Sequence, residues 1–112
     1  MTAAEFRRLA LSLPGVSEGS HMGHADFRVG GRIFATLGYP DRACATVLLS
    51  PADQDLLVRH HPKAFAPAPG AWGTKGSTIV VLRTASRLAV RTALESARAK
   101  RAPAQRRSGG GA

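Results

Sequence analysis

The chain has 112 residues, of which 44% are hydrophobic and 21% are charged. This length suits one hydrophobic core rather than two, and the composition is that of a folded globular domain and not of a disordered chain. The longest uninterrupted apolar run, Ile79 to Leu82, is far shorter than the roughly 20 residues of a transmembrane helix. Ser12 and Pro14 interrupt the first apolar run before it reaches the length of a signal-peptide core. We therefore expect a cytoplasmic protein without a membrane span.

The formal net charge of +9 is distributed unevenly along the chain. Residues 1–56 contain five basic and six acidic residues, whereas residues 57–112 contain eleven basic residues and only Glu95 as an acid. Such a positive field raises the local concentration of polyanions, so the charge favours a nucleic acid as partner. The alternative is that the charge serves solubility and reflects a general bias toward arginine.

A helix is predicted at the start of the chain. Thr2 and Glu5 have the spacing of a capping box, and apolar residues follow at intervals of three and four. The helix should run from about Ala3 to Ser12 and end before Pro14-Gly15.

Gly30-Gly31 predicts a two-residue hairpin turn, because glycine adopts positive φ at both positions at little cost. The turn would join strands at residues 26–29 and 32–37. In the first strand Phe27 and Val29 point to one face and their polar neighbours to the other, which is typical of a half-buried antiparallel strand.

A second turn at residues 39–42 should lead into a strand over residues 43–49. Ser50-Pro51 then has the pattern of a helix start, with serine as N-cap and proline at the first helical position. Leu56 and Leu57 are expected to point inward from this helix, and His60-His61-Pro62 should end it.

Residues 63–76 contain several prolines and glycines and are predicted to form a shaped loop without regular structure, anchored by Phe65 and Trp72. A strand should follow at residues 77–82. Ser86 is the expected N-cap of a last helix that ends at Ala102-Pro103. The apolar stripe of that helix consists of Val90, Ala93, Leu94 and Ala97.

The element order predicts an α+β fold of two layers, with a mainly antiparallel sheet and helices packed on one face. The domain should comprise residues 1–102, and residues 103–112 should form a disordered, basic, glycine-rich tail because they have nothing to bury. We expect a monomer or a weak homodimer.

Two groups of motifs resemble the MmcQ/YjbR-like family over roughly residues 3–101. The first group comprises Leu13-Pro14-Gly15-Val16, Gly19-Ser20-His21-Met22-Gly23-His24, Asp26-Phe27-Arg28-Val29 and Gly31-Arg32-Ile33-Phe34-Ala35-Thr36-Leu37. The second comprises Gly70-Ala71-Trp72-Gly73 followed by Thr78 and Val80. The resemblance implies a CyaY/frataxin-like fold and a DNA-binding role of the type described as a double wing. That role is itself an inference from fold.

The residues proposed to contact double-stranded DNA lie on the last helix and on two glycine-bounded projections. These projections are the Gly30-Gly31 hairpin and the loop from Gly70 to Gly76. The helix residues could contact several phosphates, and the projections, acting as wings, would bring further cations to the backbone. The alternative for the helix is an ordinary solvated face that carries a pair between Arg91 and Glu95. The helix residues are Arg87, Arg91, Arg98, Lys100 and Arg101, and the wing residues are Arg28, Arg32 and Lys75.

The alternative function is a small-ligand or protein-interaction module that uses a cleft near His21, His24 and Trp72. The spacing of His21 and His24 could suit a metal, but no cysteine cluster accompanies them, so we expect no metal site. No nucleophile motif with an adjacent base is present, and the single Cys44 lies in an apolar stretch. We therefore expect a protein that is not an enzyme and has no cofactor.

Overall fold

The computed structural model describes residues 1–102. Its elements are α1 (Ala3–Leu11), β1 (Val16–His21), β2 (His24–Val29), β3 (Arg32–Leu37), β4 (Cys44–Leu48), α2 (Pro51–His60), β5 (Phe65–Pro67), α3 (Gly70–Thr74), β6 (Ser77–Val81), the 3-10 turn η1 (Leu82–Thr84) and α4 (Arg87–Arg101). Among residues 1–102, no helix has both the length and the apolar character needed to cross a bilayer. The predicted tail lies outside the described residues.

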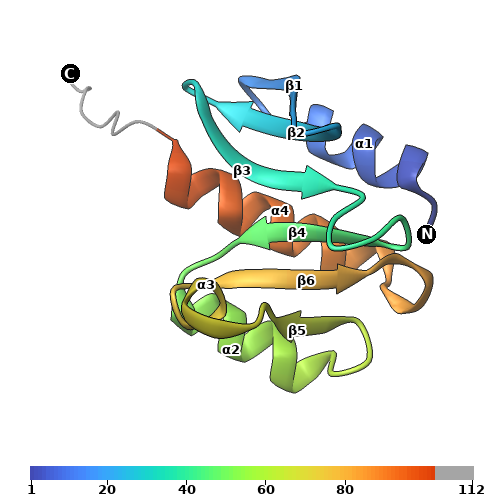
Figure 1. Cartoon of the computed structure of the whole chain (residues 1–112), viewed down its shortest axis with the longest axis vertical. Coiled ribbons are helices and arrows are strands. Elements are labelled where there is room, and N and C mark those ends of the chain that lie inside the picture. The colour runs from blue at the N-terminus through green and yellow to red at the C-terminus, as the bar shows by residue number, and fades with distance from the viewer. Residues whose placement is uncertain (103–112) are drawn as a thin grey trace.

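The six strands form one sheet in the order β1-β2-β3-β4-β6-β5, and every neighbouring pair is antiparallel. Helices α1, α4 and α2 lie next to one another on one face of this sheet, with α4 in the middle (Figure 1). The predicted α+β fold of two layers is confirmed. Within residues 1–102, the opposite face of the sheet carries no long helix.

The local signals in the sequence act as expected. Thr2 and Glu5 form the capping box of α1, and Ser50 and Ser86 each accept a hydrogen bond from a backbone N–H in the first turn of their helix. Gly30 and Gly31 have φ of 59° and 78° in the turn between β2 and β3. Each of these boundaries is therefore determined by residues that lie within a few positions of one another in the chain.

The core lies between the sheet and the three long helices. It includes Phe6, Phe27 and Phe34, none of which is exposed. The register shifts along β2 and β3, since Phe27 pairs with Ala35 and Arg28 pairs with Ile33. This bulge gives β3 one extra residue, and Phe34 and Ala35 are consequently both buried although they are adjacent.

Three expectations about the elements were wrong. Residues 63–76 are not a loop without regular structure, because they include β5 and α3. Leu56 does not point inward, since 48% of its surface is exposed, whereas Leu57 is buried. Trp72 does not anchor the segment: it is 74% exposed, and only Phe65 is buried.

Two strands were missed, β5 and β1. The sequence of β1 does not alternate apolar and polar residues, because β1 is an edge strand whose polar side chains are exposed.

Asp26 also departs from expectation. It lies on the face of β2 away from the core, yet it is completely buried, because the side chains of His21 and Arg28 lie over it.

Candidate functional site

The cations of α4 are divided between two flanks of the helix. Arg87 and Arg98 lie on the flank toward α1, where a nitrogen of Arg87 is 4.0 Å from Glu5 and Nε of Arg98 donates to the carbonyl oxygen of Pro14 at 2.6 Å. These two side chains therefore make contacts within the protein rather than pointing freely into solvent.

Lys100 lies on the other flank, where Nζ donates to the carbonyl oxygen of Leu49 at 3.3 Å. It does not extend the arginine stripe, which corrects that part of the prediction. Nε of Arg101 is buried without a hydrogen-bond partner among residues 1–102. Arg91 forms the expected pair with Glu95 at 3.4 Å.

The three predicted wing cations have different surroundings. Nε and Nη2 of Arg28 donate to Asp26 at 2.7 and 3.1 Å. Arg32 is exposed at the start of β3, and Lys75 is exposed at the end of α3. Arg28 thus has its charge paired, whereas Arg32 and Lys75 lie on separate projections.

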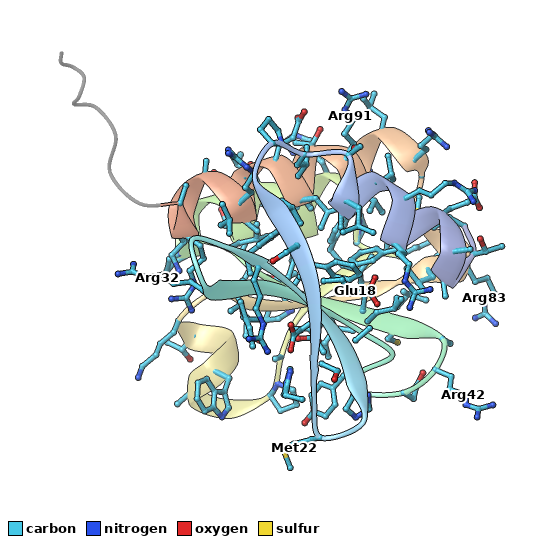
Figure 2. The ribbon with its side chains drawn as sticks, turned by 90° about the horizontal axis from the view of Figure 1, so that it is seen from above. Glu18, Met22, Arg32, Arg42, Arg83 and Arg91 are labelled. Carbon is cyan, nitrogen blue, oxygen red and sulfur yellow. The ribbon has the colours of Figure 1, made fainter. Side chains whose placement is uncertain are left out.

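Figure 2 shows that the labelled arginines lie around the molecule rather than on one side of it. Arg91 lies at the top, Arg32 at the left, and Arg83 and Arg42 at the right of that view. Met22 lies at the bottom, on the side opposite Arg91. The positive charge of the described chain is therefore distributed over several surfaces.

A pocket of about 640 Å³ lies on the face of the sheet opposite α1, α2 and α4. All three residues of the predicted cleft line it, although they come from β1, β2 and α3. Its floor is formed by side chains of the central strands, and its rim by the turn after β1, the loop after β3 and the segment around α3. The lining residues are His21, Met22, His24, Thr36, Tyr39, Pro40, Thr46, Ala68, Pro69, Trp72, Ser77 and Ile79.

Helix α3 positions Trp72 at the rim, and it can do so only because its residue 73 is glycine. A Cβ on Gly73 would be 1.7 Å from the carbonyl oxygen of Ala68. Gln54 of α2 fixes α3 from the other side, because its buried Nε2 donates to the carbonyl oxygen of Gly73 at 3.0 Å and to that of Ser77 at 3.1 Å. Sequence reasoning missed this buried amide.

His21 is held at the pocket by a buried carboxylate. Its Nδ1 is 2.7 Å from Oδ2 of Asp26. Arg28 donates from Nε to Oδ1 and from Nη2 to Oδ2 of the same carboxylate. Those bonds from Arg28, followed by the one from His21, keep the pKa of Asp26 below its usual value despite burial. Gly19, opposite Asp26 on β1, leaves space for the guanidinium, because a Cβ there would be 2.9 Å from Nε of Arg28.

The other wall of the pocket is aromatic. The rings of His24 and Tyr39 meet edge to face with centroids 5.5 Å apart. The hydroxyl of Thr46 donates to the carbonyl oxygen of Tyr39 at 2.9 Å, which fixes the loop after β3 to the sheet. Tyr39 is nevertheless 54% exposed, so its ring is accessible from solvent.

The remaining candidates of the sequence do not join this pocket. His60 and His61 lie at the end of α2, and within residues 1–102 no three histidine, cysteine, aspartate or glutamate side chains are grouped to hold a metal. Cys44 is buried, and burial raises the pKa of its thiol. The pocket is lined by aromatic, hydroxyl and imidazole groups together with apolar side chains such as Met22 and Ile79.

A search among curated proteins found no match. Among solved structures, the chain is similar to the Deinococcus radiodurans protein DR2400, which has a DUF419 domain. The TM-score is 0.70 at 20% identity, over 86% of this chain and 75% of that one. This likeness supports the fold alone. The family model described as YjbR matches residues 11–99, which is most of the chain. The chain therefore belongs to the YjbR family.

Proposed function

We propose that this protein is a binding module whose ligand site is the pocket on the face of the sheet opposite α1, α2 and α4. The observation that carries the proposal is that His21, His24 and Trp72, from three separate elements, line one pocket of about 640 Å³. That volume lies within the range of about 300–1,000 Å³ typical of small-molecule sites.

The exposed rim supports this proposal. Met22 and Trp72 are 91% and 74% exposed. Large exposed apolar side chains grouped on one surface usually mark a binding site, whereas single ones need no explanation. Because Trp72 presents a flat ring, the proposed ligand has a planar group that stacks on it.

Binding is proposed rather than catalysis. In the part of the chain that the structure describes, the histidine ring nitrogens that make hydrogen bonds contact Asp26 and the carbonyl oxygen of Leu56. Neither contact activates a hydroxyl or a thiol, as a nucleophile and its base would.

Double-stranded DNA is the second candidate partner, favoured by the charge of +9. Contacts with the phosphate backbone predict affinity that falls steeply as salt rises. The cations of α4 are less available to phosphates than the sequence predicts. Arg87 and Arg91 face carboxylates. Arg98 and Lys100 donate to backbone oxygens.

Chemical-shift mapping on the ¹⁵N-labelled protein tests both candidates. Adenosine and indole serve as planar probes at millimolar concentration, and a short DNA duplex serves as the polyanion. The proposal expects the planar probes to shift resonances around Thr36, Thr46 and Ile79, and Trp72→Ala to abolish the effect. Leu88→Ala is the matched control, because Leu88 is 75% exposed on α4. Shifts confined to α4 with the duplex, and none with either planar probe, would refute the pocket.

A further inference from the structure

We infer that the pocket is a stacking platform for the bases of a single-stranded nucleic acid. The inference rests on the proposed function, since it names the ligand class of the same pocket. Three kinds of observation support it: the shape of the sheet face, the charge around it and the accessibility of its rings.

The floor of the platform is a row of cross-strand neighbours. Thr36 of β3 pairs with Thr46 of β4, which pairs with Ile79 of β6. These side chains are short or branched and lie on the face away from the core, so a flat group can approach the sheet. Trp72 rises from α3 at one part of the rim, and Tyr39 from the loop after β3 at another.

The charge around the platform suits a polyanion. No aspartate or glutamate is among the residues that line the pocket. Two carboxylates lie near lining residues in the chain: Asp26 is buried and bound by His21 and Arg28, whereas Asp41, next to Pro40, is exposed and accepts a hydrogen bond from the N–H of Ala43 at 2.8 Å. Lys75 follows Trp72 by three residues, and the whole chain has an excess of nine positive charges. A strand of phosphates would therefore be attracted and would meet no exposed carboxylate in the pocket.

The exposed rings favour a single strand over a duplex. Inside a duplex each base face is covered by its neighbours, so an aromatic side chain can stack fully only on a base that has left the helix. Single-strand-binding proteins combine aromatic side chains of this kind with a positively charged surface, and they bind with little preference for sequence. The phosphates would add the salt dependence expected from the charge.

The test measures the fluorescence anisotropy of a labelled oligothymidylate of about 12 nucleotides, a length within the site sizes of single-strand-binding domains. Binding is compared with that of an oligouridylate of equal length and of a duplex of equal charge. Trp72 is the only tryptophan of the chain, so its emission reports on this pocket alone. We expect the single strands to bind more tightly than the duplex and to quench that emission.

Variants separate stacking from charge. Trp72→Ala should weaken single-strand binding about tenfold, the loss expected for one stacked base. Trp72→Phe should retain part of the affinity, and Leu88→Ala all of it. Because Trp72 is exposed, Trp72→Ala and Trp72→Phe should both leave the fold intact, which circular dichroism verifies. The ratio between the deoxyribose and ribose strands then identifies which strand the pocket prefers.

Three outcomes overturn the inference. The first is duplex affinity equal to or above single-strand affinity together with no effect of Trp72→Ala, because the cations alone would then carry binding. The second is pocket shifts with adenosine or indole but no binding of either oligonucleotide, which rejects the strand and leaves the proposed function standing. The third is the absence of both pocket shifts with the planar probes and binding of either oligonucleotide, which refutes this inference and the proposed function together.

Discussion

Replacing Gln54 by methionine tests whether one buried amide holds the segment that carries Trp72. Methionine has a similar volume, so the substitution removes the hydrogen bonds without opening a large cavity. In the native protein, Nε2 of Gln54 lies 3.0–3.1 Å from the carbonyl oxygens of Gly73 and Ser77 and from the hydroxyl oxygen of Thr78.

The expected cost follows from what the acceptors lose. The carbonyl oxygen of Gly73 also accepts from the N–H of Gly76, and that of Ser77 from the N–H of Ala68. Neither oxygen is left unpaired in Gln54→Met, so the full desolvation penalty does not apply. The two N–H groups of the amide should be worth about 1 kcal/mol each, which predicts a loss of about 2 kcal/mol in the free energy of unfolding. For a domain of this size that corresponds to a decrease in Tm of roughly 10 °C.

Urea unfolding followed by circular dichroism measures this difference, and Trp72 emission reports separately on α3. Leu56→Ala is the control on the same helix, because Leu56 is half-exposed and its loss should cost little. If Gln54→Met lay within about 0.5 kcal/mol of wild type, the size of an ordinary surface substitution, the amide would not be the tie between α2 and α3.

Three further predictions concern single groups. Folding lowers the pKa of Asp26, so the carboxylate contributes its full stabilisation above its ordinary pKa and loses it as pH falls through the lower pKa of the folded state. Asp26→Asn should therefore lower the free energy of unfolding by about 2 kcal/mol at neutral pH. Its stability should approach that of wild type in acid, as acid titrations of both proteins would show. Gly76→Ala should lose about 3 kcal/mol or more in thermal melts, because its Cβ would lie 1.8 Å from the carbonyl oxygen of Leu49 at a φ of +114°. Gly23→Ala, with no neighbour near the added Cβ, should cost only about 1 kcal/mol, and equal losses would contradict the clash. Cys44 should react with a thiol reagent slowly in the native protein and quickly in denaturant, because burial raises its pKa; fast native labelling would count against this.

Elements with strong local signals could be predicted from the sequence. Thr2, Ser50 and Ser86 identify the starts of three helices, and Gly30-Gly31 identifies a hairpin, because in each case the stabilising contact lies within a few residues. The segment at residues 63–76 could not be predicted in the same way. Its strand β5 depends on pairing with β6, and α3 depends on contacts with residues distant in the chain.

The candidate site was predicted only in part. The cleft residues His21, His24 and Trp72 do come together, but the contribution of Tyr39, Thr36 and Thr46 depends on strand register, which the sequence does not specify. The pairing of Arg28 with Asp26 was also invisible, since both residues were read as exposed side chains of a half-buried strand. The expected likeness to frataxin and the binding of double-stranded DNA stay predictions.

The two borders of the sheet have a consequence for association between copies of the protein. At one border, β5 is only three residues long and ends at Pro67, which has no N–H to offer to another strand. At the other, β1 presents polar side chains, and Glu18 is held there by Arg7 at 3.0 Å. Short, proline-containing and charged borders discourage strand addition and aggregation. A homodimer, if one forms, should therefore use a surface other than a sheet continued from one molecule into the next.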